Sequence, residues 1–400
     1  MAVQDEASTF SFADMLAPIT PETFFADHYG QQWLYIPGDA RKFPDVLNWS
    51  SLTALLNKSG IWTSTNLGLV LDRKGVPILD YCYPTKTPDG VDIFRPDGAR
   101  VMGLLRKGAS LVANEIDSFT PGLSALASVL EETLSAKVQA NLYCSWQAHQ
   151  AFDSHFDTHD VYAIQLEGEK LWHIYEGCLD NPISHPAFND MPQSQHEQQK
   201  GRLEAEIVMR PGDVMYLPRG HYHDAIAVTG DSMHVTFGAT AVIGLDFLNT
   251  LMEAAADDPL FRADCPRPAE GRQRMAAHLE ALAERAAEIG QSAPFAETMT
   301  ALRAGFYYPR GGYDLPVQLE KQSFNVRPGF ELVWDGEKAV LNGPRGSLPV
   351  PEGLGQAVEW IVRQERFTAD EFAGSAEALE PAVRDKLLGD LVTMKVLDQT

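Results

Sequence analysis

The feature that most constrains the fold is a series of short β-type runs, separated by turn residues, in the middle of the chain. Residues 161–175 hold two runs rich in aromatic and β-branched side chains that meet at Glu167–Gly168, which predicts a β-hairpin. Residues 206–217 repeat this form around the turn residues Pro211–Asp213, and a further strand is expected at 234–242. Because no helical segments alternate with these runs, the pattern favours an antiparallel sandwich or barrel over a parallel α/β sheet.

Segments with helical spacing of apolar residues flank this β-rich region. Before it, residues 21–29 and 121–136 are expected to form helices, and after it residues 246–253 and 268–304 are expected to do so. Residues 315–400 mix short strands with amphipathic helices, a combination of winged-helix size. We therefore expect an α+β fold with a separate helical layer and a small C-terminal domain.

Charge and composition exclude several function classes. The 400 residues include 32 Lys plus Arg and 55 Asp plus Glu, which give a net charge of −23. Such a field repels phosphate backbones and attracts basic partners, so we expect no direct nucleic-acid binding. Residues 315–400 carry nine basic and fourteen acidic side chains, the wrong sign for a duplex-binding wing. No apolar run approaches the ~20 residues that a bilayer crossing needs, so no membrane association is expected.

The cysteines and the first residues point to a reducing compartment. The four cysteines contain no CxxC pair, which suits free thiols better than a disulfide framework or a thiolate metal site. The sequence MAVQDEASTF lacks the basic and apolar regions of a signal peptide. The expected location is the cytoplasm.

Histidines concentrate in the β-rich region. Nine of the eleven lie between positions 149 and 234, an enrichment that a metal or acid/base site would leave. Among them, His155 and Asp157 form the one His-x-Asp pair of the chain. Because residues i and i+2 of a strand project from one face, these two side chains could share a cation. His159 has the same parity and is expected to be a neighbour of the site.

A second motif lies downstream, at 212–223. The sequence GDVMYLPRGHYH matches the pattern G-x5-P-x-G-x2-H, in which a Pro-x-Gly turn follows a strand and directs the final histidine, His223, back toward the sheet. This pattern resembles the second sequence signature of cupin barrels. His221, two residues earlier, is the alternative ligand.

Two histidines and one carboxylate are compatible with two kinds of metal site. With the other coordination positions open they form the facial triad of non-haem Fe(II) oxygenases, while zinc hydrolases use the same donors. Lys170 favours the first, because an ammonium on the face of a strand that also carries Trp172 and Ile174 is costly to bury without an anion. A dicarboxylate cosubstrate would supply that anion. The alternative is that Lys170 lies at a solvated edge of the sheet, where it would need no anion.

The chain resembles the JmjC-type 2-oxoglutarate oxygenases, and within them the ribosomal oxygenases, which include the bacterial ribosomal-protein arginine hydroxylase and the nucleolar histidine hydroxylases. The stretches that carry the resemblance are FFADHYGQQWLYIPG (24–38), LLRKGASLVANEID (104–117), VQANLYCS (138–145), FDSHFDTHDVYAIQLEGEKLWHIY (152–175), PGDVMYLPRGHYHDA (211–225) and SMHVTFG (232–238). The sequence departs from the family at Ala151, where glycine is frequent, and in having HYH after Pro-x-Gly. Both departures bear on substrate choice.

The resemblance implies a fold and a set of site residues. The fold is a double-stranded β-helix (jelly-roll, cupin-type) core, expected at about 137–245 within an oxygenase domain of residues 1–245. A helical dimerisation region at 246–310 and a winged-helix-like domain at 311–400 would follow. By position, the resemblance makes Fe(II) ligands of His155, Asp157 and His223. It also makes Lys170 the partner of the 2-oxoglutarate C5 carboxylate, with Asn141 and Thr236 as further cofactor-binding candidates.

These features together predict an Fe(II)- and 2-oxoglutarate-dependent oxygenase that hydroxylates an Arg or His side chain of a basic protein, expected to be a ribosomal protein. The alternatives are the same chemistry on a biosynthetic peptide or a small molecule, and a non-catalytic metal-binding cupin that recognises proteins. The apolar positions of the helical region predict a homodimer, because they exceed what a closed barrel can cover. These positions are Phe247, Leu248, Leu251, Met252, Met275, Leu279 and Leu282.

Overall fold

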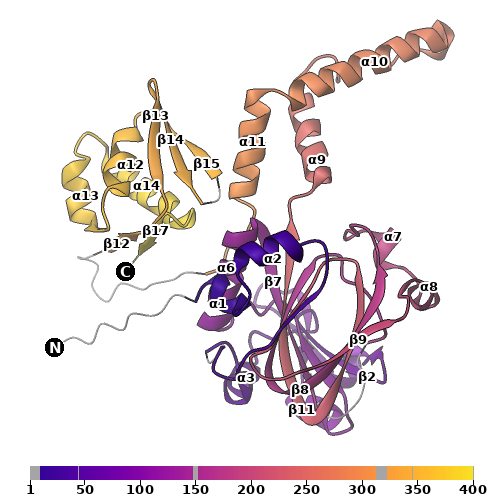
Figure 1. Ribbon diagram of the computed structural model, residues 1–400. Coiled ribbons are helices and arrows are strands. Elements are labelled where there is room, and N and C mark those ends of the chain that lie inside the picture. Colours follow the sequence, from indigo (N-terminus) through magenta and orange to yellow (C-terminus); the bar gives the residue numbers. More distant parts are fainter. Residues whose placement is uncertain (1–9, 44, 147–151, 312–321, 345, 400) are drawn as a thin grey trace. The chain divides into compact units, whose positions relative to one another are not determined.

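The computed structural model describes residues 10–43, 45–146, 152–311, 322–344 and 346–399. Its contacts divide the chain into two compact units (Figure 1). The first runs to Ala241 and includes Tyr308–Arg310, and the second comprises Val242–Tyr307 and Gly311–Thr400. The helical and C-terminal regions, which the sequence predicts as separate segments, thus fall in one unit. None of the described helices combines the length and the apolar composition needed to cross a bilayer.

The first unit is built on a nine-stranded antiparallel sheet. The strand order is β1-β10-β8-β11-β7-β6-β2-β3, with β9 also paired to β8. The antiparallel sheet expected from the sequence is confirmed. Its strands are β1 (Leu34–Ile36), β2 (Leu67–Leu71), β3 (Lys74–Gly75), β6 (Ser110–Ala113), β7 (Ala136–Ser145), β8 (Asp160–Cys178), β9 (Leu203–Met209), β10 (Val214–Leu217) and β11 (His221–Ala241).

Helices and a separate hairpin accompany this sheet. The predicted helices at 21–29 and 121–136 are present as α2 and α6, each with Pro at its first position and a threonine cap. The full set is α1 (Phe12–Leu16), α2 (Pro21–Asp27), α3 (Trp49–Leu56), α4 (Ile78–Tyr81), α5 (Gly98–Leu105), α6 (Pro121–Leu134), α7 (Pro186–Asn189) and α8 (Gln193–Gln199), with the hairpin β4 (Cys82–Lys86) and β5 (Asp92–Pro96).

The predicted hairpin at 161–175 is wrong, because β8 is one continuous strand. Gly168 adopts φ +63°, yet both halves of β8 pair with β11, and the register between the two strands shifts at this point. The chain therefore does not reverse at Gly168 but passes through a bulge between β8 and β11, in which residues 228–231 of β11 stand opposite residue 169 of β8. Before the bulge Val161 and Ala163 belong to one hydrophobic cluster, and after it Trp172 and Ile174 belong to the same cluster, so the bulge changes which parity faces inward.

The predicted turn at Pro211–Asp213 is confirmed and is held by side-chain hydrogen bonds. Gly212 has φ +97°, and a Cβ atom there would lie 1.9 Å from the carbonyl oxygen of Asp39, so glycine is required. The carboxylate of Asp213 accepts hydrogen bonds from the backbone N–H of Gly38 (2.8 Å) and from the hydroxyl of Tyr35 (2.9 Å). This turn joins β9 to β10 and ties β10 to the segment after β1.

A buried arginine links residues 308–310 to the sheet of the first unit. The Arg310 side chain is 7% exposed, and its guanidinium contacts Asp117 (Nε to Oδ2, 2.7 Å), the Glu131 carboxylate and the Val138 carbonyl oxygen. We expect Arg310→Ala to lower the free energy of unfolding by about 3–5 kcal/mol, because two buried carboxylates lose their cation. Chemical denaturation measures this loss.

The matched control is Arg202→Ala, which removes an exposed arginine paired with Glu176. An exposed ion pair contributes at most about 1 kcal/mol. Equal destabilisation by the two substitutions would contradict a structural role for Arg310.

The second unit contains the helices expected after residue 245 and a mixed C-terminal region. Its hydrophobic cluster includes Phe324, Ile361, Phe367 and Leu391. Its strands form the sheets β16-β12-β17 and β13-β14-β15. The elements are α9 (Gly244–Ala255), η1 (Pro268–Glu270), α10 (Gly271–Gly290), α11 (Ala293–Ala304), β12 (Ser323–Val326), β13 (Glu331–Asp335), β14 (Lys338–Gly343), β15 (Gly346–Val350), α12 (Gly355–Val362), β16 (Arg366–Thr368), α13 (Ala369–Ser375), α14 (Pro381–Thr393) and β17 (Leu397–Gln399).

Candidate metal centre

Backbone hydrogen bonds join the His-x-Asp segment to the start of β11. The N–H of His155 donates to the carbonyl oxygen of His223 (3.0 Å), and the N–H of His223 donates to that of His155 (2.8 Å). This pair is an isolated bridge, so the strand expected at 155–157 is reduced to one residue. Gly220, with φ +89°, donates its N–H to the carbonyl oxygen of Asp157 (2.9 Å). The Pro-x-Gly turn thus connects the two motifs directly.

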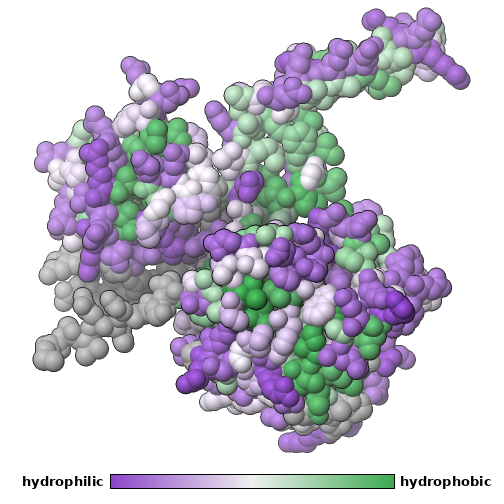
Figure 2. Space-filling view, viewed as in Figure 1, coloured by the Kyte–Doolittle hydropathy of each residue, from purple (hydrophilic) through white to green (hydrophobic). Residues whose placement is uncertain are grey.

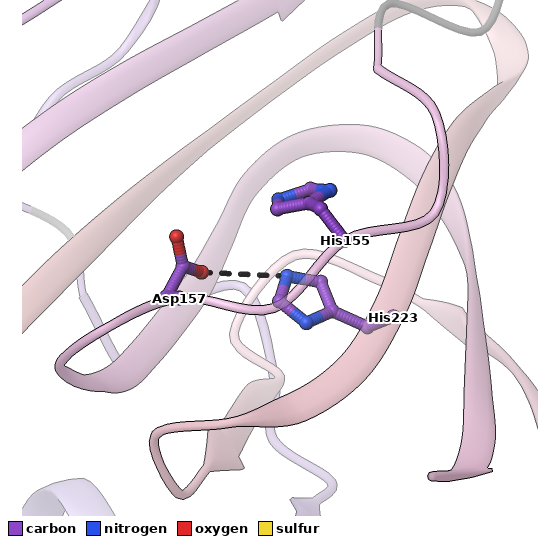
Figure 3. Close-up of side chains that lie close together, drawn as sticks. All are labelled: His155, Asp157 and His223. Carbon is purple, nitrogen blue, oxygen red and sulfur yellow. Dashed lines mark ion pairs between the residues drawn. The ribbon is translucent and has the colours of Figure 1, made fainter. Parts of the chain in front are cut away.

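The three predicted ligand side chains converge (Figure 3). Among the described residues, His155, Asp157 and His223 form the one group whose donor atoms all lie within 4.8 Å of one another. The Nε2 atom of His223 is 3.5 Å from Oδ2 of Asp157, and the two imidazole centroids are 4.6 Å apart. His223 is buried, whereas the other two residues keep partial exposure. The arrangement can hold one cation.

Hydrogen bonds to backbone carbonyls set the tautomer of both imidazoles. The Nδ1 of His155 lies 2.8 Å from the carbonyl oxygen of Asp153, and the Nδ1 of His223 lies 3.0 Å from that of His221. A carbonyl oxygen only accepts hydrogen bonds, so each Nδ1 carries the hydrogen. The Nε2 lone pairs are therefore left for a metal, as in established histidine metal sites.

The local electrostatics favour the protonation states that a metal needs. Burial, with a contribution from His155, lowers the pKa of His223 to about 4, so its imidazole is neutral at neutral pH. Burial alone would raise the pKa of Asp157, but His159, His155 and His223 together hold it below its ordinary value. The site thus offers the neutral imidazole of His223 and the carboxylate of Asp157, with the imidazole of His155 beside them.

Lys170 is buried and has no anionic partner among the residues that the structure describes. It is 5% exposed, and burial lowers its pKa to about 8, an effect that the neighbouring Cys144 opposes. Within the part of the chain that the structure describes, no carboxylate forms an ion pair with its Nζ atom. A buried ammonium without a counter-ion is costly, so this position suits an anionic ligand.

Asn141 and Thr236, the other predicted cofactor-binding residues, are paired across β7 and β11. Thr236 is 9% exposed, and the Oδ1 atom of Asn141 accepts a hydrogen bond from the N–H of Glu115 (3.1 Å). Because directly opposed residues of an antiparallel pair share a face, the structure places these two side chains together.

The same faces carry three aromatic rings, of which the sequence reasoning placed Trp172 beside Lys170 but assigned no site role to Trp172, His234 or Tyr143. Tyr143 stacks on His234 (centroids 4.9 Å apart), and Trp172 stacks on His223 (5.6 Å) and meets His234 edge-on. Each lies two residues from a predicted site residue on the same strand, so the period of two would have found them. Among the described residues, Nδ1 of His234 and Nε1 of Trp172 are buried without a hydrogen-bond partner. They are free to contact a ligand.

The alternative histidines lie outside the convergent group. His221 is buried and its Nε2 atom has no partner among the described residues. The ring of His159 packs against Gly238, and its Nδ1 lies 3.2 Å from the carbonyl oxygen of Asp160. His149 lies outside the described residues, as does Ala151.

Known proteins resemble this chain in sequence. The family model of the JmjC domain matches residues 116–246. Ribosomal oxygenase 1 of Gallus gallus is 28% identical over 247 residues, which cover 61% of this chain and 39% of that protein. The bifunctional lysine-specific demethylase and histidyl-hydroxylase NO66 of Drosophila pseudoobscura pseudoobscura is 26% identical over 236 residues, or 58% of this chain and 23% of that protein. The chain thus matches well under half of each relative's length.

A solved structure shares the fold. The Escherichia coli ribosomal oxygenase YcfD aligns with 96% of this chain and 98% of its own at 15% identity, with a TM-score of 0.56. Its complex with cobalt and 2-oxoglutarate gives a TM-score of 0.55 at 16% identity. The predicted α+β fold with a cupin-type core is confirmed.

Proposed function

We propose that this chain, whose residues 116–246 are a JmjC domain, is an Fe(II)- and 2-oxoglutarate-dependent oxygenase that hydroxylates a protein side chain. The observation that carries the proposal is the combination of a convergent His155, Asp157 and His223 group with the buried Lys170 that has no anionic partner in the described chain. A zinc hydrolase would use the same three ligands but has no need of that ammonium.

The residues fit both cofactors. His155, Asp157 and His223 would bind Fe(II), and three protein ligands would leave room for 2-oxoglutarate and dioxygen, as in facial-triad oxygenases. When bound, iron and 2-oxoglutarate would activate dioxygen: 2-oxoglutarate would lose CO2 and take one oxygen atom to become succinate, and the other oxygen atom would insert into a C–H bond of the substrate to give its hydroxyl group. Lys170 would neutralise the distal carboxylate of 2-oxoglutarate. The buried ring of Trp172 and the half-buried ring of Tyr143 would exclude water, which strengthens that charge pair.

The proposed substrate is an Arg or His side chain of a basic ribosomal protein. Two considerations support this. The related proteins are named ribosomal oxygenase and histidyl-hydroxylase, and the net charge of −23 favours a cationic polypeptide over nucleic acid.

Mass spectrometry of ribosomal proteins tests the proposal. We expect the purified enzyme with Fe(II) and 2-oxoglutarate to add about 16 Da, the mass of one oxygen, to one ribosomal protein. Asp157→Ala is the matched inactive control. If no ribosomal protein gains mass while the enzyme still consumes 2-oxoglutarate, a biosynthetic peptide or a small molecule becomes the better substrate. If 2-oxoglutarate is not consumed with any substrate, a non-catalytic recognition protein is the better account.

We further propose that the protein is a homodimer assembled through its second unit. Figure 2 shows hydrophobic residues gathered over α9 and α11, and Leu248, Met252 and Leu279 are each more than half exposed. Leu248 and Met252 also line a hollow of about 490 Å³. Symmetric pairing is the commonest way to cover such a surface.

Met252→Glu should convert the dimer to a monomer at micromolar concentration, because it places a charge in an apolar contact. Sedimentation velocity measures the change. Arg272→Glu, an exposed charge change on α10, serves as the control. A wild-type protein that sediments as a monomer would contradict the proposal.

A further inference from the structure

The neighbours of the metal-binding histidines in the chain meet on the far side of the ligand segments. Ser154 precedes His155 and Asp224 follows His223, and extended backbone points successive side chains to opposite faces. The hydroxyl of Ser154 donates to Oδ2 of Asp224 (2.8 Å). A side-chain hydrogen bond therefore joins the two ligand segments behind the backbone bridge between His155 and His223.

Asp224 is the centre of this network. It is 3% exposed, and its Oδ2 atom also accepts a hydrogen bond from the hydroxyl of Tyr175 (2.7 Å). Its Oδ1 atom accepts one from Nδ1 of His173 (2.7 Å). Three donors thus hold one buried carboxylate, and two of them come from β8, so Asp224 couples the ligand segments to the central strand of the sheet.

The connection between β8 and β9 contributes a second set of contacts. Lys200, directly after α8, donates from Nζ to the hydroxyl of Ser154 (3.2 Å) and lies 4.7 Å from the centroid of the Tyr175 ring. Gln193, the first residue of α8, donates from Nε2 to the carbonyl oxygen of Ser154 (3.1 Å). Both ends of this helix therefore contact the residue that precedes His155.

The middle of α8 contacts the other neighbours of the ligands. His196 lies with Nδ1 3.2 Å from the hydroxyl of Tyr222, which precedes His223. Phe156, between His155 and Asp157, packs against both rings, with centroids 5.4 Å from His196 and 5.3 Å from Tyr222. Three residues adjacent to ligands, Ser154, Phe156 and Tyr222, thus contact Asp224 or α8. The fourth, Asp224, is held by its three hydrogen-bond donors.

We propose that Asp224, Ser154 and Lys200 are positioning residues that hold His155 and His223 at the separation the metal requires. The inference rests on the proposed metal centre but on no particular substrate. A metal site tolerates ligand displacements of only about 0.5 Å, and loss of an outer partner typically weakens metal affinity about 10- to 100-fold. These three residues touch no proposed metal or cosubstrate position themselves and act through the two ligand segments.

Direct metal titration tests the inference. Co(II) is added to the metal-free full-length protein, and its visible absorption is followed without 2-oxoglutarate or substrate. We expect Asp224→Asn to weaken Co(II) binding about 10- to 100-fold, with Ser154→Ala and Lys200→Met toward the lower end. Lys200→Arg should restore most of the loss, because it retains a cationic donor. At saturating metal the KM for 2-oxoglutarate should stay unchanged, since Lys170 is not disturbed.

The matched control is Arg202→Gln, which removes another cationic side chain close to α8. Among the described residues, the Arg202 side chain pairs only with the exposed Glu176. If the three positioning variants lower the denaturation midpoint but bind Co(II) like the wild type, the network is merely structural and the inference is wrong. Should Asp224→Asn fail to fold, the milder Ser154→Ala and Lys200→Met decide by the same criterion. A wild-type protein that binds no Co(II) would instead overturn the proposed metal centre, and the inference with it.

Discussion

Replacing Asp157 with alanine is expected to abolish iron binding and turnover while leaving the fold intact. The substitution removes the one carboxylate of the convergent group and leaves only two imidazoles, which bind a divalent ion far more weakly. The backbone contacts that hold the segment involve the carbonyl of Asp157 and the two histidines, so they survive. Metal content after dialysis and 2-oxoglutarate consumption measure the effect, and circular dichroism checks the fold.

His223→Ala should give the same loss of metal, whereas His221→Gln should retain it. The second variant is the matched control, because His221 is a buried histidine of the same turn whose side chain lies outside the convergent group. Metal that persists in both Asp157→Ala and His223→Ala would show the ligand assignment to be wrong. Metal lost only in His221→Gln would make His221 the ligand.

Lys170→Met should raise the 2-oxoglutarate concentration needed for half-maximal activity about 10- to 150-fold. A charge-assisted bond lost in a dry site costs roughly 1.5–3 kcal/mol, and methionine preserves most of the packing. The rate at saturating 2-oxoglutarate should fall much less, since the ligands of the metal are untouched. Lys58→Met, at an exposed lysine after α3, is the control. An unchanged 2-oxoglutarate requirement would exclude Lys170 from the cosubstrate site.

The pH dependence of 2-oxoglutarate affinity provides an independent check on Lys170. Burial lowers the pKa of its ammonium from 10.5 to about 8, so the free enzyme loses this charge as the pH rises through about 8. Because only the protonated form attracts a carboxylate, affinity should decline progressively above that pH. The Lys170→Met variant lacks the titrating group. The difference between the two profiles isolates its contribution, and parallel profiles would contradict the assignment.

The local motifs of this protein could be predicted from sequence because each depends on short-range geometry. A Pro-x-Gly turn needs a glycine that tolerates positive φ, and Gly220 has φ +89° with a backbone oxygen 2.0 Å from where a Cβ would lie. Helices α2 and α6 begin at Thr-Pro pairs whose capping chemistry is local. The prediction that Lys170 shares a strand face with Trp172 and Ile174 follows from the two-residue period of a β-strand alone.

The wrongly predicted hairpin at Glu167–Gly168 shows where such reasoning fails. Positive φ at a glycine is compatible with both a reversal and a bulge, and the local sequence does not distinguish them. Pairing with β11, more than fifty residues later in the chain, decides for the bulge. That outcome also places Val161 and Ala163, which precede the bulge, in the same hydrophobic cluster as Trp172 and Ile174, which follow it.

The sequence by itself determined the ligand types, the turn that carries His223 and the strand face that carries Lys170, since these follow from residue chemistry and backbone periodicity. Only the tertiary structure decided what holds them. Asp224 meets Ser154 across 70 residues, and Arg310 reaches Asp117 across 193. Such contacts depend on how distant segments pack, because a buried charge takes whatever partner the fold brings within reach. No spacing rule along the chain encodes that choice.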